Sequence, residues 1–293
     1  MNDYIVRATA LEGRIRAFGA VTTQLVEELR QRHQATPVAT AAMGRAATVG
    51  AVMGLMLKGD NRLTIQIKGG GPIGQIIVDA NARGEVRAYA SNPHVDLPLN
   101  LIGKLDVAGA VGTNGFLNVI KDMGLKNPYQ GSVEIISGEL GEDFAYYFSQ
   151  SEQTPSVVGV GVLVDRDYTV KVAGGFILQL LPGVSGEDVS YIEEQLSKVP
   201  GVTSLLSEGA TPEQILENLI PGPVKFLERE PVRFQCTCSH ERLEKVLISL
   251  GEGELQSMID EDQGAEVECS FCKEKYYFSD EHLMTLIDRI KEK

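Results

Sequence analysis

The sequence contains no tryptophan, and aromatic residues make up only 6% of it. Aromatic rings are the surfaces on which unpaired bases stack, so this composition does not favour a protein that binds them. Cysteine is scarce too: the chain has four, and all of them lie in its last fifth. A chain of 293 residues buries a sizeable core and holds roughly two domains. The confinement of every thiol to one end therefore needs an explanation.

Long apolar runs are also missing. The most apolar segment, Ala46 to Leu57, has twelve residues, whereas a membrane-spanning helix needs about twenty. The amino-terminal segment has Asp3 where a secretory signal would carry basic residues. We therefore expect a cytoplasmic protein without a membrane partner. Because the cytoplasm keeps thiols reduced, four cysteines there indicate metal binding or redox chemistry rather than static disulfides.

Positive charge is lacking where a nucleic-acid-binding tail would need it. The net charge of −13 is distributed as −1 over residues 1–182, −6 over 183–230 and −6 over 231–293. Neutralising phosphates requires Lys and Arg, so the acidic tail predicts no nucleic-acid partner.

Residues 1–182 predict an α+β domain with a mixed or antiparallel sheet. A helix is indicated over 36–59, with Thr36 as its N-cap, Pro37 at its first position and burial on most sides. Another helix is expected over 141–152. Consecutive strands with interspersed helices favour this class over a doubly wound parallel sheet. The predicted strands are DYIVRATA, GRIRAFGA, RLTIQIKG, PIGQIIVDA, GEVRAYA, GSVEIIS, SVVGVGVLVD and YTVKVAGGFILQLL.

The composition changes near Pro182, and we expect an acidic helical linker over 183–230 followed by a small domain over 231–293. The two predicted linker helices, GEDVSYIEEQLSKV and TPEQILENLIPGP, have narrow apolar stripes. Such helices are marginal alone, so the linker is expected to fold only while something holds it. In the tail, each cysteine pair precedes a predicted helix, SHERLEKVLISLG or SDEHLMTLIDRIKEK. A unit of about sixty residues has too small a core to be stable without a cross-link.

The cysteines form two close pairs, Cys236-x-Cys238 and Cys269-x-x-Cys272. Zn²⁺ takes four thiolates in a tetrahedron, and two close pairs on separate loops are the usual way to supply them. The spacing predicts one zinc ion per chain, in a structural or a further role. Two alternatives are a thioredoxin-like reductase, disfavoured by the acidic helical surroundings of Cys269 and Cys272, and a zinc ribbon for nucleic acid, disfavoured by the missing basic patch.

Other polar motifs have simpler interpretations. His240 and His282 could replace a cysteine as ligand, but four thiolates complete the shell, so both are predicted as solvated residues at helix starts. GGGPIG at 69–74 fits the dinucleotide pattern G-x-G-x-x-G, but strand-like residues follow it, which predicts a turn. Asp165 and Asp167 are expected in a hairpin turn. No catalytic constellation stands out elsewhere, so an enzyme is not predicted.

The combination of an α+β domain, an acidic linker and this cysteine pattern resembles the bacterial redox-regulated heat-shock chaperones of about 33 kDa. ASNPHVDLPLN, GVGVLVDRDYTVKVAGGFILQLLPG and RFQCTCSHERLEKVL are similar to that family too, so the resemblance covers essentially the whole chain. It implies that Cys236, Cys238, Cys269 and Cys272 bind zinc when reduced, and pair as Cys236–Cys238 and Cys269–Cys272 when oxidised. It also implies an ATP-independent holdase for unfolding or oxidatively damaged clients, which is a homodimer when active.

The implied mechanism is physically reasonable. Structural zinc contributes an apparent ~10–16 kcal/mol to small modules, which is more than their own cores supply. Oxidation of the thiolates removes the ligands, so the tail would unfold, and linker helices packed on it would lose their support. We hypothesise a cytoplasmic chaperone of the oxidative stress response that oxidation and zinc release switch on. The alternative is a constitutive zinc protein acting as a nucleic-acid or protein adaptor.

Overall fold

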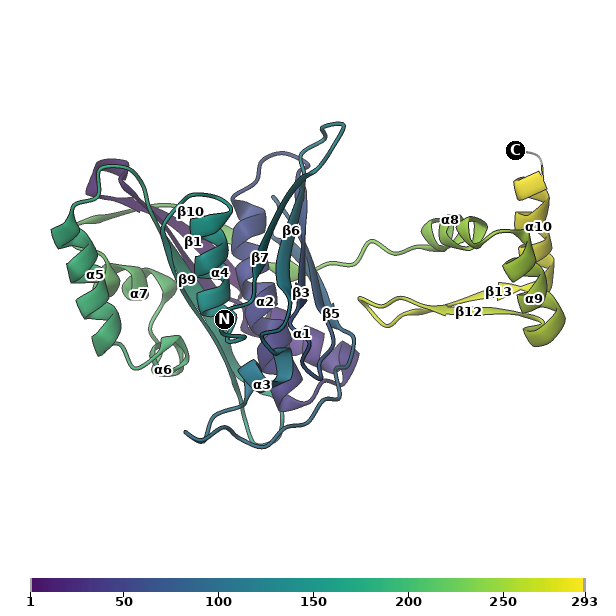
Figure 1. The fold of residues 1–293 in the computed structure, drawn as a ribbon, viewed down its shortest axis with the longest axis horizontal. Coiled ribbons are helices and arrows are strands. Elements are labelled where there is room, and N and C mark those ends of the chain that lie inside the picture. Colours follow the sequence, from purple (N-terminus) through teal and green to yellow (C-terminus); the bar gives the residue numbers. More distant parts are fainter. Residues whose placement is uncertain (1, 292–293) are drawn as a thin grey trace. The chain divides into compact units, whose positions relative to one another are not determined.

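The structure is a computed structural model that describes residues 2–291 of the chain. These residues form two compact units, which divide between Gln235 and Cys236 (Figure 1). Two larger β-sheets and helices α1–α7 belong to the first unit, whereas a two-stranded sheet and helices α8–α10 belong to the second. The predicted α+β class is confirmed.

One sheet of the first unit is antiparallel throughout, with its strands in the order β10–β1–β2–β9–β8. A short 3₁₀ turn, η1 at Leu11–Gly13, connects β1 to β2. Alternate residues point to opposite faces, so that Phe176 and Ile177 enter two different apolar clusters. Both faces of this sheet are therefore covered. The bounds are Tyr4–Ala10 (β1), Ile15–Val21 (β2), Ser156–Val164 (β8), Val170–Leu180 (β9) and Val224–Pro231 (β10).

The other sheet has six strands in the order β11–β5–β4–β3–β6–β7. The short strand β11 runs parallel to β5, and the remaining neighbours are antiparallel. The loop with GGGPIG joins β3 to β4, so the predicted turn between strands is confirmed. The bounds are Arg62–Lys68 (β3), Ile76–Asn81 (β4), Glu85–Ala90 (β5), Phe116–Asp122 (β6), Tyr129–Glu134 (β7) and Arg233–Phe234 (β11).

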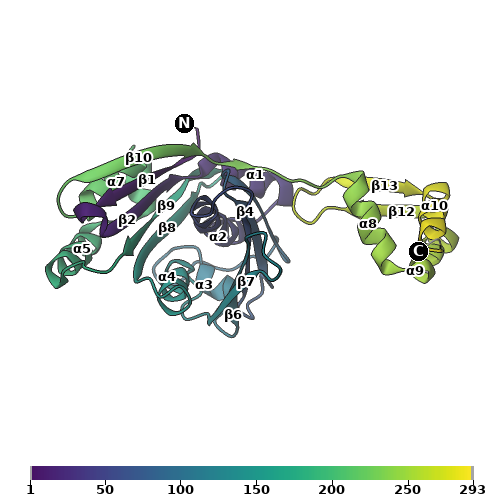
Figure 2. The same ribbon diagram turned by 90° about the horizontal axis from the view of Figure 1, so that it is seen from above.

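Helix α2, Pro37–Leu55, lies between the two sheets at the centre of the larger apolar core (Figure 2). Its predicted start is confirmed, since the Thr36 side chain accepts the N–H of Ala39 and Pro37 follows the cap. By length and composition, this helix could cross a membrane. The twelve-residue apolar run in the sequence did not predict that. However, 94% of its most apolar window is buried inside the protein. Its place in the core accounts for its composition.

Three further helices flank the sheets of this unit. Helix α1, Thr23–His33, packs on α2 and β9, and α3, Val107–Val111, packs on α2. The predicted helix near 141–152 is confirmed as α4, Gly141–Gln150, which packs on β7 and β8.

Residues 183–230, predicted as a linker, pack against the five-stranded sheet. They form α5 (Gly186–Lys198), α6 (Val202–Ser207), α7 (Pro212–Leu219) and the edge strand β10. The helices cover the sheet face turned away from α2 (Figures 1 and 2). This face is the support that the marginal helices require. A functional division into 1–182, 183–230 and 231–293 stays a prediction, whereas the compact units divide after residue 235.

The second unit is a hairpin with three helices. Strand β12, Gly264–Glu268, pairs antiparallel with β13, Lys275–Ser279. Helices α8 (His240–Leu250) and α10 (Asp280–Lys291) confirm both sequence predictions as far as the described residues extend, and α9 (Glu252–Asp262) lies between them in sequence. The core of this unit is small. Its buried apolar side chains are Leu247, Leu255, Ile259, Phe278, Leu283, Leu286 and Ile287.

Candidate metal centre

The four cysteines lie on two short segments of the second unit. Cys236 and Cys238 belong to an extended stretch that ends at Ser239, whose side chain caps the start of α8 by accepting the N–H of Arg242. Cys269 and Cys272 belong to the turn between β12 and β13. In this turn the Cys269 carbonyl accepts the N–H of residue 273, so both thiols of the turn are presented together.

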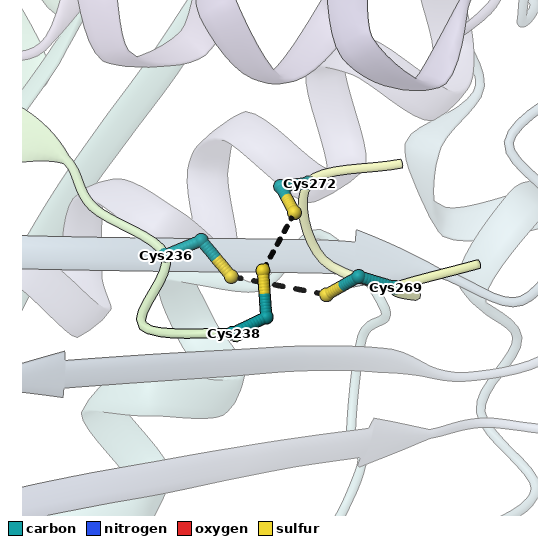
Figure 3. Close-up of side chains that lie close together, drawn as sticks. All are labelled: Cys236, Cys238, Cys269 and Cys272. Carbon is teal, nitrogen blue, oxygen red and sulfur yellow. Dashed lines mark hydrogen bonds between the residues drawn. The ribbon is translucent and has the colours of Figure 1, made fainter. Parts of the chain in front are cut away.

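The structure brings all four sulfur atoms within 4.8 Å of one another. The Sγ atoms of Cys236 and Cys269 are 3.8 Å apart, and those of Cys238 and Cys272 are 3.2 Å apart (Figure 3). A tetrahedral ion with sulfur ligands at about 2.3 Å holds its ligands about 3.8 Å from one another. The four thiols therefore fit one zinc ion in number, chemistry and spacing.

Burial makes two of the four thiols, Cys238 and Cys272, weaker acids. Cys269 and Cys272 are buried, and Cys236 and Cys238 are partly buried. Desolvation raises the pKa of both Cys238 and Cys272, because it disfavours the charged thiolate. A metal ion reverses this preference, since only thiolates act as its ligands. Metal binding to this site is therefore expected to release protons.

Tyr276 in β13 supplies a contact that the sequence did not predict. Its hydroxyl donates to Glu274 Oε2 at 3.1 Å and lies 3.1 Å from Cys238 Sγ, a contact in which either group can be the donor. The hydrogen bond with Cys238 raises the pKa of Tyr276, so the phenol stays protonated and available as a donor. An O–H donor beside a thiolate stabilises its negative charge.

The two histidines near the cysteines form a separate group. His240 starts α8 and His282 lies in the first turn of α10, and both approach Glu244 rather than the four sulfur atoms. Within residues 2–291, this group and the four cysteines are the arrangements of three or more His, Cys, Asp or Glu side chains suited to a metal ion.

The acidic pair between β8 and β9 is structural. Asp165 and Asp167 lie in the hairpin turn, where Asp165 Oδ1 accepts the N–H of Arg166 and Asp167 Oδ1 accepts the N–H of Thr169. The predicted hairpin turn is confirmed, and its carboxylates serve the backbone.

Comparison with known proteins gives one consistent result. A family model described as Hsp33 protein matches residues 3–279. The 33 kDa chaperonin of Geobacillus sp. strain WCH70 is 55% identical over 98% of this chain and 97% of its own, and that of Bacillus subtilis strain 168 is 54% identical over 98% and 99%. A crystal structure of the 33 kDa chaperonin, a heat shock protein 33 homologue, from Thermotoga maritima matches 100% of both chains with a TM-score of 0.93 and 36% identity.

Proposed function

This chain belongs to the Hsp33 family, and from that premise we propose that it is a redox-regulated, ATP-independent chaperone. A chaperone role follows from the family. We propose further that the protein is a holdase and not an enzyme: it binds unfolding or oxidatively damaged proteins and keeps them from aggregating. It is inactive while its four cysteines are reduced and becomes active when they are oxidised.

The observation that carries this proposal is the convergence of four sulfur atoms in a unit with a small apolar core. In the reduced chain, Cys236, Cys238, Cys269 and Cys272 hold one Zn²⁺ ion. The ion supplies a four-way cross-link between the segment before α8 and the β12–β13 turn. Such a cross-link contributes an apparent ~10–16 kcal/mol in small modules, so folding of this unit depends on the state of its thiols.

Oxidation converts the four thiols into two disulfides. Each pair of zinc-bound thiolates gives up two electrons to a two-electron oxidant such as hydrogen peroxide, which takes up two protons from the solvent and leaves as two water molecules. We propose the pairs Cys236–Cys238 and Cys269–Cys272, which the resemblance to the family implies. A disulfide sulfur carries no negative charge, so no thiolate remains to hold the ion.

Loss of the second unit then releases α5–α7 from the five-stranded sheet. The N–H of Gln235 donates to the carbonyl of Val86 in β5. The next residue is Cys236, so the last residue bonded to the sheets is adjacent to the first cysteine of the switch. Residues 183–230 carry a net charge of −6, and their self-repulsion opposes docking. Release uncovers an apolar face of β1, β2 and β9 to which unfolded clients bind. The active form is a cytoplasmic homodimer without nucleic-acid or membrane partners.

The proposal is tested by light scattering of a chemically unfolded client protein diluted into buffer. Reduced, zinc-loaded protein is expected not to suppress aggregation. Protein oxidised with hydrogen peroxide is expected to suppress it without ATP, and dithiothreitol with zinc should restore the inactive form. Equal suppression by the two forms would overturn the switch, and no suppression by either would favour the adaptor. Peptide mapping of the oxidised chain checks the proposed disulfide pairs.

A further inference from the structure

A second group of metal-ligating side chains lies in the second unit, separate from the group of four cysteines. His240 and Glu244 are four residues apart on this helix and therefore share one face. His282 lies in the first turn of α10, 38 residues after Glu244 in the sequence, and its side chain meets the other two. The candidate ligand atoms of the three side chains lie within 4.8 Å of one another.

The distances suit ligands of a common ion. Glu244 Oε1 is 3.1 Å from His282 Nε2, and the two imidazole rings are nearly parallel, at 8°, with centroids 6.0 Å apart. Nitrogen and oxygen ligands at about 2.0–2.1 Å from a tetrahedral ion lie about 3.3 Å from each other. The Glu244–His282 contact is therefore already close to the spacing that a bound ion requires.

Neighbouring residues hold the three ligands in place. The buried Phe278 packs against both rings, with centroids 4.5 Å from His240 and 5.4 Å from His282. Arg289 donates to the other carboxylate oxygen, Glu244 Oε2, at 2.9 Å and leaves Oε1 directed at His282. Such outer contacts orient ligands and restrict their rotamers.

An ion pair between Glu244 and His282, reinforced by Arg289, is the simpler explanation of part of this arrangement. This ion pair does not explain the position of His240. Within residues 2–291, the His240 ring makes aromatic contacts and no hydrogen bond. Two imidazoles and one carboxylate are a ligand set suited to zinc, nickel and other divalent first-row metals. His240 is exposed and the other two are partly exposed, so water can complete the shell.

We propose that His240, Glu244 and His282 form a second, lower-affinity site for a divalent transition-metal ion such as Zn²⁺, separate from the four thiols. An ion there joins α8 to α10, two helices of the same small core. Its ligands are not thiols, so peroxide that oxidises the cysteines leaves them intact. The effect of the site on the switch rests on the proposed function: a bound ion slows the unfolding of the second unit after oxidation when free zinc is abundant.

The binding test uses reduced protein that carries one zinc ion, so it does not depend on chaperone activity. Titration with Zn²⁺ in a calorimeter is expected to show one further site per chain. Co²⁺ is the spectroscopic probe, and its bound form should show weak visible bands without a thiolate charge-transfer band. His282→Ala and Glu244→Gln are each expected to weaken the second site at least about tenfold. His94→Ala, which removes an exposed histidine outside the second unit, is the matched control and should change nothing.

Elemental analysis after gel filtration checks that each variant keeps its first zinc ion and hence its fold. If His282→Ala loses that ion, the Glu244→Gln variant, which preserves side-chain size, decides the question. Absence of a second binding event, or equal binding by wild type and both variants, overturns the proposal. Loss of the switch with an intact second site would instead count against the proposed function alone.

Discussion

The hydroxyl of Tyr4 in β1 donates a hydrogen bond of 2.9 Å to Glu213 Oε2 in α7, across 209 positions of the sequence. Arg229 of β10 completes the contact, with its Nε 2.6 Å from Glu213 Oε1. The Glu213 side chain is only 12% exposed, so its carboxylate depends on these two partners. The three residues tie α7 to two strands of the sheet that it covers.

Replacing Glu213 with Ala should loosen α7 in the reduced protein. The change leaves the partly buried Tyr4 hydroxyl without its acceptor, which costs on the order of 1 kcal/mol, whereas the exposed Arg229 guanidinium exchanges its partner for water. Hydrogen exchange of residues 212–219 should speed up, and a small holdase activity should appear without oxidation. Glu217→Ala, an exposed position on the same helix, is the control and should behave as wild type. Unchanged exchange in the Glu213 variant would mean that apolar packing alone holds α7.

A stronger effect is expected from Leu216→Asp. Leu216 is fully buried between α7 and the sheet, and a carboxylate there loses packing and is desolvated, at a cost above about 3 kcal/mol. Leu196 in α5 is only partly buried, so Leu196→Asp should cost less. Aggregation suppression by the reduced, zinc-bound variants should therefore rank Leu216→Asp above Leu196→Asp above wild type. A reversed ranking would place the important contacts in α5.

Two truncations test the contributions of the second unit and of helices α5–α7 to masking the five-stranded sheet. A chain ending at 235 keeps α5–α7, β10 and β11, whereas one ending at 182 exposes the apolar side chains of β1, β2 and β9 beneath them. Neither contains a cysteine, so chelators should not affect their unfolding. Both lack the second unit, so both should suppress aggregation without oxidation, and the shorter, which has no α5–α7 to cover its sheet face, should bind more of an apolar dye. An inactive chain ending at 235 would show that loss of the second unit does not release α5–α7.

Local signals in the sequence predicted the elements that local chemistry determines. Thr36 and Pro37 mark the start of α2, and alternating residues mark the long strands. Strand β10 was missed, because Val224–Pro231 contains four charged residues and becomes a strand only by pairing with β1, more than two hundred positions away. The sequence predicted that something must hold the linker helices without identifying it, and the structure shows their apolar side chains packed on the sheet.

The same limit applies to the candidate site. The spacing of Cys236, Cys238, Cys269 and Cys272 predicted their convergence, since close pairs indicate a tetrathiolate by themselves. Nothing in the local pattern placed His282 against Glu244, because these residues meet only through the packing of α8 on α10. Such contacts depend on tertiary structure, which residue spacing alone does not determine.

The buried carboxyl of Asp3 should give the first unit an unusual pH dependence. Desolvation raises the pKa of Asp3 to about 6, even though it accepts the N–H groups of Gln24 and Leu25. An unfolded Asp titrates near about 3.9, so between these values the folded protein holds a proton that the unfolded chain has released. The contribution of Asp3 to stability therefore rises as pH falls from 7 towards 4.

Denaturant unfolding of wild type and Asp3→Asn at pH 5 and pH 7 tests this dependence. Wild type should lose about 1 kcal/mol relative to the variant on going from pH 5 to pH 7, because Asn cannot ionise. Effects of pH on the cysteines cancel in this comparison, since Asp3 lies in the other unit. A constant difference between the two proteins would mean that the folded Asp3 titrates normally.

Tyr276 should set how fast the switch responds to oxidant. We expect Cys238 to be the sulfur that attacks peroxide, and a hydrogen bond from the Tyr276 hydroxyl, 3.1 Å away, withdraws electron density from it. Tyr276→Phe removes only that hydroxyl, and a lost hydrogen bond of about 1 kcal/mol corresponds to roughly fivefold faster oxidation. Zinc release after a hydrogen peroxide pulse, followed with a chromogenic chelator, measures the rate. The neighbouring Tyr277 is more exposed, so Tyr277→Phe is the matched control and should leave the rate unchanged. If Tyr276→Phe oxidises no faster than the control, Cys238 is not the thiolate that limits activation.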